Sequence, residues 1–209
     1  MKYNVWAATL NGLFIVRSAY KLAMEESRSS NRGSSSNPSK TCRFWKRLWS
    51  LQVPHKVRPF TWRACKSILP TKENLVRRAI QLNVGCEECK EEVEFVGHIL
   101  WSCSRAKEVW PCTKMKFHFD QTRVNSFHDL LWQILMTDSF EEEGTELVVI
   151  VAWALWSNRN KVRHGGRKKS AVALFQWSRQ YLQEFHEASQ MVPNTVMPRV
   201  VGWSPPPRS

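Results

Sequence analysis

Three cysteines and one histidine between residues 86 and 103 have the types and the spacing of metal ligands. They form the pattern Cys86-x2-Cys89-x8-His98-x4-Cys103. Three thiolates and one imidazole are the donor set that a tetrahedral zinc ion prefers, and a Cys-x2-Cys turn presents two sulfurs from one tight loop. Four protein ligands leave no coordination position for a substrate. The spacing therefore predicts one zinc ion in a closed, structural site.

The last two of these residues constrain the local backbone. His98 and Cys103 lie five positions apart, and five residues correspond to a rotation of about 140° around an ideal α-helix. They cannot both point from one face of such a helix. The helix that carries Ile99 and Leu100 is therefore expected to break near Ser102.

No comparable constellation for catalysis is present in the sequence. Aspartate occurs only at Asp120, Asp129 and Asp138, so a two-metal centre built on clustered carboxylates is hard to assemble. We find no nucleophile held by a base, and the chain is predicted not to be an enzyme. The remaining cysteines and histidines have no partner at ligand spacing and are predicted to be ordinary core or surface residues: Cys42, Cys65, Cys112, His55, His118, His128, His164 and His186.

Length and composition indicate an ordinary globular chain. It has 209 residues, of which 43% are hydrophobic and 23% are charged. The longest uninterrupted apolar run, 147–156, is far shorter than the roughly 20 residues of a membrane span, so no membrane association is expected. The six cysteines occur without an obvious secretory leader, which predicts an intracellular, reducing compartment, the nucleus or the cytoplasm.

The net charge of +13 is unevenly distributed along the chain. Residues 1–80 carry 16 Lys and Arg against three Asp and Glu, residues 81–150 carry six against 13, and residues 151–209 carry nine against two. A basic surface attracts phosphate through counterion release, which predicts non-specific binding to RNA or DNA. The plainer interpretation is that the cations only keep the chain soluble. The predicted nucleic-acid contacts lie within the basic segment 40–78: Lys46, Arg47, Lys56, Arg58, Arg63, Lys66, Arg77 and Arg78.

The metal-binding segment itself is not expected to contact nucleic acid. Three thiolates around one Zn²⁺ leave the centre formally anionic. Lys90 is the only cation between the ligands, so we expect this segment to repel phosphate and to act as a clamp on the fold. The carboxylates between the predicted ligands are Glu87, Glu88, Glu91, Glu92 and Glu94.

Apolar periodicity predicts helices after a short N-terminal β-hairpin. The Asn11-Gly12 dipeptide favours a type I′ turn between two apolar runs, 5–10 and 13–16. Residues 27–39 are too polar to form a core and are predicted to be a flexible linker. Three short helices are expected next. The apolar positions of the first are Trp45, Leu48 and Trp49, and those of the second are Val57, Phe60, Thr61, Ala64, Cys65 and Ile68. The third would be capped by Thr71 and has apolar positions at Leu75, Val76, Ala79 and Leu82.

Three longer helices are predicted in the second half of the chain, at 126–136, 145–163 and 169–189. The middle one is apolar on every side over 147–156, which predicts that it is buried. The last carries apolar residues that include Val172. Core packing is also the preferred interpretation of Trp45 and Trp49, over base stacking, because they share one stripe with Leu48.

An ordered series of motifs extends over most of residues 1–163. It comprises Asn11-Gly12 through Val16, Ser18-Ala19-Tyr20, Trp45, Trp49, Pro54-His55-Lys56-Val57, Phe60-Thr61-Trp62-Arg63-Ala64, Leu69-Pro70-Thr71, Leu75, Arg78, Cys86, Cys89, Glu94, His98, Cys103, Ala106, Val109 and Trp110. This series resembles the zinc-binding domain that follows the reverse transcriptase in plant-type non-LTR retrotransposon polyproteins. The resemblance implies an accessory zinc-binding domain without polymerase or RNase H activity of its own. Downstream, Trp153, Trp156, Arg159 and Asn160 resemble the segment that joins this domain to an RNase H-like domain.

The fold class that follows is mainly α with a small N-terminal β-hairpin, in which a short-helix zinc-knuckle domain precedes a helical segment. We place the hairpin and a first helix at 1–26, the linker at 27–39, the zinc-binding domain at 40–115, a connecting helical segment at 116–190 and a Pro-rich tail at 191–209. The expected partners are RNA or DNA and other domains of such a polyprotein. The alternative is a protein-interaction scaffold with a purely structural zinc site, whose basic surface docks an acidic partner.

Overall fold

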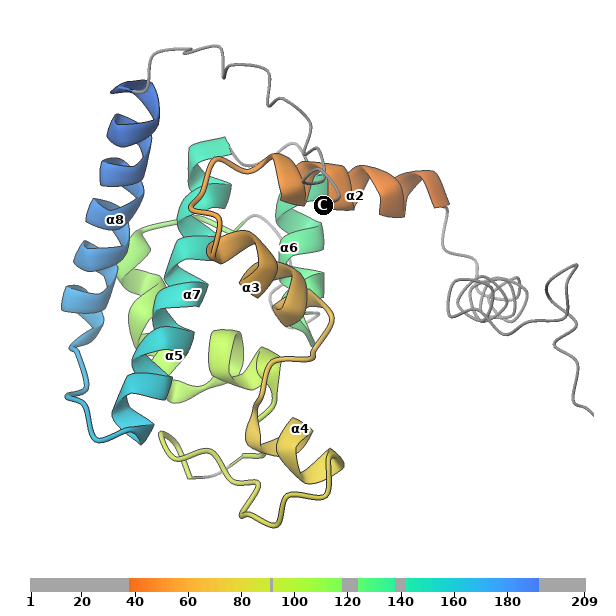
Figure 1. Ribbon diagram of the computed structural model, residues 1–209, viewed down its shortest axis with the longest axis vertical. Coiled ribbons are helices and arrows are strands. Elements are labelled where there is room, and N and C mark those ends of the chain that lie inside the picture. The colour runs from red at the N-terminus through yellow and green to blue at the C-terminus, as the bar shows by residue number, and fades with distance from the viewer. Residues whose placement is uncertain (1–37, 91, 118–123, 138–141, 192–209) are drawn as a thin grey trace, which may run out of the picture. The chain divides into compact units, whose positions relative to one another are not determined.

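The computed structural model describes residues 38–90, 92–117, 124–137 and 142–191, and these are mainly helical (Figure 1). The helices are α2 (Pro38–Ser50), α3 (Val57–Cys65), α4 (Lys72–Arg77), η2 (His98–Ser102), α5 (Ser104–Val109), η3 (Trp110–Thr113), α6 (Phe127–Met136), α7 (Glu142–Arg163) and α8 (Ala171–Met191). Within these ranges the β-structure consists of one isolated bridge, between Gly85 and Val93. The predicted helical class is confirmed, and the predicted N-terminal hairpin lies outside the described residues.

The chain divides into two compact units, Met1–Arg43 and Phe44–Ser209. The described part of the first unit is the start of α2, at 38–43. The hydrophobic core and the candidate site both belong to the second unit, whose buried apolar residues extend from Phe44 to Leu182. The finer domain boundaries drawn from the sequence stay predictions.

Helix α3 follows the predicted periodicity. Its buried residues are Val57, Phe60, Thr61, Ala64 and Cys65, which recur at the three- and four-residue spacing of one helix face. The helix packs against α6 and α7. It ends at Cys65, one turn earlier than the apolar pattern implied, so Ile68 is 41% exposed instead of continuing the buried stripe.

The buried stripe of α2 differs from the predicted one. Phe44 and Leu48 are fully buried, whereas Trp49 is 45% exposed and Trp45 is half-buried. The ring of Phe44 stacks on Trp132 of α6, with the ring centroids 5.2 Å apart. Assignment of Trp49 to the core was therefore wrong. Phe44 and Leu48 lie four residues apart and form a stripe of their own on this short helix.

Helix α4 begins as predicted but buries different residues. The Thr71 hydroxyl accepts a hydrogen bond from the backbone N–H of Asn74, as expected of a helix cap. The helix then ends at Arg77, with Ala79 in the left-handed region at a φ of 62°. Lys72 and Asn74 are buried, whereas Val76 is 38% exposed. The predicted apolar stripe of this third helix is therefore wrong beyond its first turn.

Helix α6 is closed at its start by reciprocal hydrogen bonds. The Ser126 hydroxyl accepts a bond from the N–H of Asp129, and the Asp129 carboxylate accepts one from the N–H of Ser126. This capping box satisfies two backbone donors that a helix start leaves open. The face that follows packs into the core through Phe127, Leu130, Leu131, Ile134 and Leu135.

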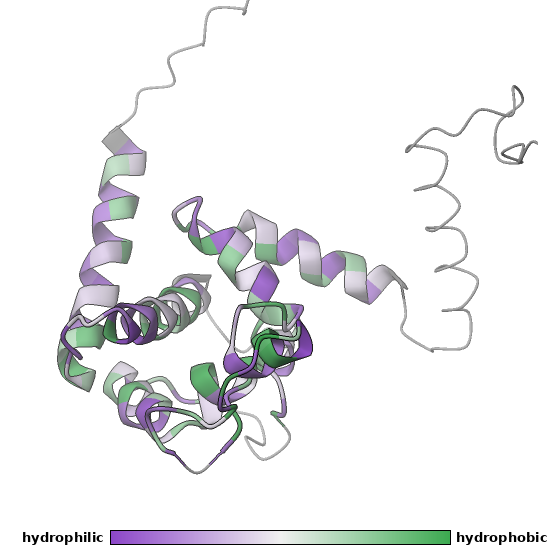
Figure 2. Cartoon of the chain, turned by 60° about the horizontal axis from the view of Figure 1, so that its bottom comes forward, coloured by the Kyte–Doolittle hydropathy of each residue, from purple (hydrophilic) through white to green (hydrophobic). Residues whose placement is uncertain are grey.

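Helices α7 and α8 form an antiparallel pair, in which α7 lies between α3 and α8 and contacts both (Figure 1). The middle of α7 is buried as predicted, with 148–152 fully enclosed. Gly165 ends the helix at a φ of 81°, a conformation that glycine adopts without steric cost. Along α8 hydrophilic and hydrophobic residues are interleaved (Figure 2), with Leu174 and Leu182 buried but Val172 55% exposed. Val172 therefore does not belong to the buried face predicted for this helix.

Within the described residues, no helix combines the length and the apolar composition needed to cross a membrane.

The capping box of α6 gives a prediction about stability. Ser126→Ala removes the side-chain acceptor and should lower the free energy of unfolding by about 1 kcal/mol. Urea denaturation measures the difference. Ser189→Ala is the matched control, because the Ser189 hydroxyl is exposed and bonds only the carbonyl of Phe185 within its own helix. A loss for Ser126→Ala no larger than that of the control would contradict the role of the cap.

Candidate metal centre

The structure brings the four predicted ligands together. The ligand atoms of Cys86, Cys89, His98 and Cys103, hereafter the Cys3His cluster, all lie within 4.8 Å of one another. The sulfurs of Cys86 and Cys103 are 3.8 Å apart. A tetrahedron with Zn–S bonds of about 2.3 Å has an edge of about 3.8 Å, so the spacing of these sulfurs fits a shared zinc ion. Their assignment as zinc ligands stays a prediction, which this geometry supports.

A π-helical turn positions two of the four ligands. The segment His98–Ser102 forms η2, and the N–H of Cys103 donates to the carbonyl of His98 over 2.8 Å. A bond between residues five apart winds the chain more loosely than an α-helix, so His98 and Cys103 can face one centre. The backbone then becomes extended at Cys103, at a ψ of 144°. The structure thus has the predicted break after Ser102, but it also contains a π-turn that the α-helical argument did not anticipate.

The imidazole of His98 is held by a carboxylate on its far side. Its Nε2 lies 3.3 Å from the sulfur of Cys89, while its Nδ1 lies 2.7 Å from Oε2 of Glu92. The Ser102 hydroxyl is 3.4 Å from the same Nδ1. A carboxylate on the outer nitrogen of a histidine fixes the orientation of the ring and makes its inner nitrogen a better ligand. Glu92, which the sequence suggested would only repel phosphate, thus orients His98.

The surroundings of the cluster disfavour bare thiolates. Cys86 and Cys103 are 3% and 2% exposed. Burial is the main cause that raises the pKa of the Cys103 thiol to about 12, and it also raises the pKa of Cys86. A divalent cation at this position would compensate the charge of the thiolates and offset the cost of their burial. The donor set therefore fits a structural zinc ion, whose chemistry is to hold the loop.

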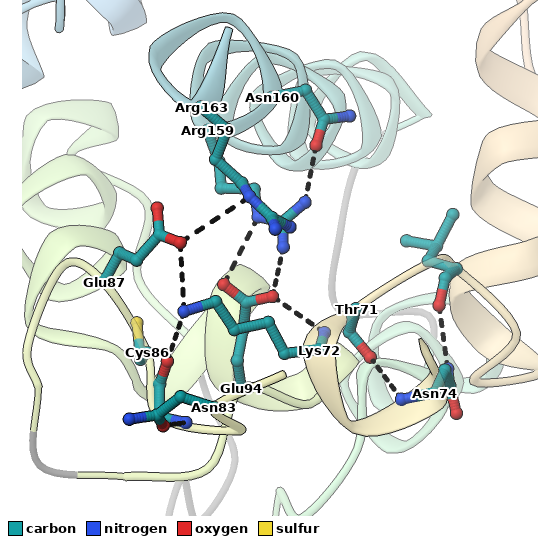
Figure 3. Close-up of polar contacts among 12 residues, drawn as sticks. Thr71, Lys72, Asn74, Asn83, Cys86, Glu87, Glu94, Arg159, Asn160 and Arg163 are labelled. Carbon is teal, nitrogen blue, oxygen red and sulfur yellow. Dashed lines mark hydrogen bonds and ion pairs between the residues drawn. The ribbon is translucent and has the colours of Figure 1, made fainter. Parts of the chain in front are cut away.

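A buried ion pair links residues 86–103, hereafter the metal-binding loop, to α7. The carboxylate of Glu94, 1% exposed, receives the guanidinium of Arg159 (Figure 3), whose Nε lies 3.3 Å from Oε2. Glu94 also accepts a bond of 2.9 Å from the backbone N–H of Lys72. Burial lowers the pKa of Arg159, whereas the negative charge of Glu94 opposes that shift. Arg159 is one of the residues that resemble the connecting segment, and it here completes the fold of the metal-binding loop.

The other described glutamates of the loop are compensated as well. Glu87 lies 3.0 Å from the ammonium of Lys72 and 3.7 Å from Nε of Arg163, and the hydrogen bond from Lys72 is the main cause that lowers its pKa (Figure 3). Glu88 pairs with Lys168 from the turn between α7 and α8. The expectation that Lys90 alone opposes these carboxylates was wrong. The compensating cations come from other elements and are not adjacent in sequence.

The predicted nucleic-acid contacts are spread over α2, α3, α4 and their flanks. Arg47 is half-buried and donates to the carbonyl of Leu135, and Arg58 is half-buried with its Nε enclosed. Arg77 pairs with Glu73 at 2.8 Å. The structure leaves the remaining predicted contacts exposed, and these are Lys46, Lys56, Arg63, Lys66 and Arg78.

A comparison of the sequence with known families agrees with the donor set of this cluster. Residues 14–110 match a family described as zinc-binding in reverse transcriptase. The match confirms the resemblance seen in the sequence. The matched segment contains the whole Cys3His cluster and its carboxylate partners, but it ends before Arg159. The ion pair that links the cluster to α7 therefore includes a side chain outside the matched region.

The chain is also similar to a curated protein whose name refers to ribonuclease H. A putative ribonuclease H protein of Arabidopsis thaliana is 31% identical over 106 residues. The match includes 50% of this chain and 16% of the relative, so the chain spans about a sixth of that protein's length. No solved structure matches the chain.

Thiol alkylation tests the cluster. With zinc present at about pH 8, iodoacetamide should modify Cys42 and Cys112 but neither the cluster cysteines nor Cys65, because bound thiolates are protected and the pKa of Cys65 is raised by burial to about 12. A chelator should make the three cluster cysteines reactive, because a closed zinc site supplies folding free energy and loss of the ion opens the segment around these thiols to solvent. Mass spectrometry of the peptides measures the labelling. Equal labelling of the cluster with and without chelator would contradict metal binding.

The buried ion pair predicts a large cost of removing one partner. Arg159→Met leaves Glu94 buried without its cation and should lower the free energy of unfolding by about 3 to 5 kcal/mol. Glu94→Gln should partly restore stability in that background. The matched control is Arg77→Met, which breaks an exposed pair with Glu73 and should cost less than about 1 kcal/mol. Urea denaturation compares the variants, and equal losses for the buried and exposed pairs would contradict the assignment.

Proposed function

We propose that this chain is a non-catalytic module that one structural zinc ion holds folded and that binds RNA or DNA through exposed cations of α2, α3 and their flanks. The Cys3His cluster supports the metal part, because its four protein ligands have the donor types and the sulfur spacing of a closed zinc site. The match to a zinc-binding family over the segment that contains these residues also supports it. Zinc here stabilises the loop and leaves no position for a substrate.

The distribution of charge is the observation that carries the nucleic-acid part. The described glutamates of the metal-binding loop are paired with cations or with His98, so they offer little uncompensated negative charge. By contrast, Lys46, Arg63 and Arg78 are exposed and form no ion pair within the described part of the chain. Phosphate groups would neutralise such cations and release their counterions, a driving force that does not depend on sequence.

The second candidate is a protein-interaction scaffold, and a specific feature favours it. Several apolar side chains around α4 face solvent, among them Ile68, Val76, Ile80 and Val93, which are 38% to 47% exposed. Apolar residues of this kind can form the centre of a protein interface. A partner with acidic residues around an apolar patch would use both features. The experiment below separates this candidate from nucleic-acid binding.

The context of the chain is part of the proposal. Polymerase and RNase H activities would belong to other domains of a longer polyprotein, and those domains are further proposed partners. The nucleus or the cytoplasm is the proposed location, where cysteines stay reduced and available to zinc.

Salt-dependent binding to single-stranded RNA tests the proposed function. Each phosphate contact contributes about 0.7 to the slope of log affinity against log salt concentration. Arg63→Glu combined with Lys66→Glu removes two exposed cations and should reduce the magnitude of this slope by about 1.4 or more. Fluorescence anisotropy at several salt concentrations measures both quantities. Zinc content by native mass spectrometry should be one ion per chain.

The matched control is charge reversal at two exposed lysines outside the basic segment, Lys107 and Lys116. This variant should keep most of the wild-type slope. RNA affinity that does not change with salt concentration would exclude phosphate binding. Unchanged RNA binding by the Arg63 and Lys66 variant, together with the loss of a protein partner, would favour the scaffold.

A further inference from the structure

Three aromatic rings from α7 and α8 form a cluster that the sequence did not reveal. Trp153 of α7 and Trp177 and Tyr181 of α8, hereafter the aromatic cluster, have centroids 5.0 to 5.5 Å apart. The rings of Trp177 and Tyr181 are nearly parallel, with 10° between their planes. Trp153 is inclined by 23° to Tyr181 and by 33° to Trp177. All three rings are half-buried, so part of each faces solvent.

Lysines lie over the faces of these rings. The ammonium of Lys56, at the start of α3, is 4.7 Å from the centroid of Trp153 and 5.2 Å from that of Tyr181. The ammonium of Lys169, from the turn before α8, is 5.1 Å from the centroid of Trp177. Two separate segments thus bring positive charge to one aromatic surface. Neither lysine forms an ion pair with a carboxylate within the described residues.

The turn between α7 and α8 adds further positive charge next to this surface. Residues 161–169 include five Lys and Arg and no acidic residue. Lys161 and Arg167 are exposed and form no ion pair in the described part of the chain. Lys169 connects this turn to the aromatic cluster through its contact with Trp177. The basic turn therefore continues directly into the aromatic surface.

We propose that the aromatic cluster is a stacking site for bases of single-stranded nucleic acid, with Lys56, Lys169 and the basic turn binding the flanking phosphates. The inference rests on the proposed function and adds to it a site and a substrate form. Aromatic rings beside a positively charged track are the features by which proteins hold unpaired strands. Bases within a duplex are stacked on one another, so this site selects unpaired strands.

The lysines over the rings are compatible with this role. An exposed cation–π contact is weaker than the stacking of a base on an aromatic ring. A base can therefore displace the ammonium from a ring face, and the flexible lysine chain lets the ammonium reach the neighbouring phosphate. The charge is retained at the site, where it adds to the binding of the strand.

Two leucine substitutions test the proposal with oligo(U) of about 12 nucleotides, a length within the site sizes of single-strand binding folds. Trp177→Leu and Tyr181→Leu each keep an apolar side chain between the helices but remove a stacking ring. Each should weaken binding by about tenfold, the effect of losing one stacked base. The salt dependence should stay as in the wild type. A Lys169→Gln variant should instead reduce the salt slope by about 0.7.

The matched control is Trp49→Leu, which removes an exposed tryptophan of α2. It should bind as the wild type does. A 5-bromouridine version of the probe should photocrosslink to a peptide from 171–191. Circular dichroism and thermal melting establish whether each variant is folded. If a leucine variant does not fold, Lys169→Gln still tests the site.

The outcomes separate this inference from the proposed function. Wild-type protein that binds neither oligo(U) nor a duplex overturns both, whereas binding of a duplex alone overturns the stacking site. Salt-dependent wild-type binding that neither leucine variant weakens beyond Trp49→Leu overturns the stacking site alone. An equal loss of duplex binding in the leucine variants overturns selectivity for unpaired strands. Binding of an acidic peptide that depends on Trp177, without such dependence for oligo(U), assigns the cluster to a protein partner and overturns the proposal.

Discussion

The metal-binding loop depends on a carboxylate that is almost completely buried. Glu94 is 1% exposed, and a buried charge without a partner costs several kcal/mol. The compensation comes from Arg159, which lies 65 positions further along the chain on α7. The loop is therefore complete only when α7 is folded beside it. A zinc ion would hold the four ligands together, but the ion pair connects the loop to the core.

The glutamates of the loop also reduce the number of cations that are available at the surface of the molecule. The carboxylates of the loop form ion pairs with four cations, which are Lys72, Arg159, Arg163 and Lys168. These cations are consequently less available to an external anion than their number suggests. Cations that form no such pair within the described residues occur on several other elements, among them Lys46 of α2, Arg63 of α3, Lys107 of α5 and Arg167 between α7 and α8. Charge counted along the sequence therefore overstated both the acidity of the loop and the availability of some basic residues.

Particular elements show which local patterns could be interpreted reliably. The stripe of α3 and the Thr71 cap of α4 follow from residues within one or two turns of each other, and the structure has them. On α2 two stripes were available, one through Trp45 and one through Phe44, and periodicity alone does not choose between them. Only the presence of Trp132 across from Phe44 makes that stripe the buried one.

The sequence by itself determined the donor set of the candidate zinc site and the end of the helix after Ser102, because both depend on spacing over a few residues. The tertiary structure decided which cation compensates Glu94 and which segments build the aromatic cluster. The first joins positions 94 and 159, and the second joins Trp153 of α7 to Trp177 and Tyr181 of α8. Such pairs arise only when helices pack against one another, and no local periodicity encodes which distant side chain will be opposite.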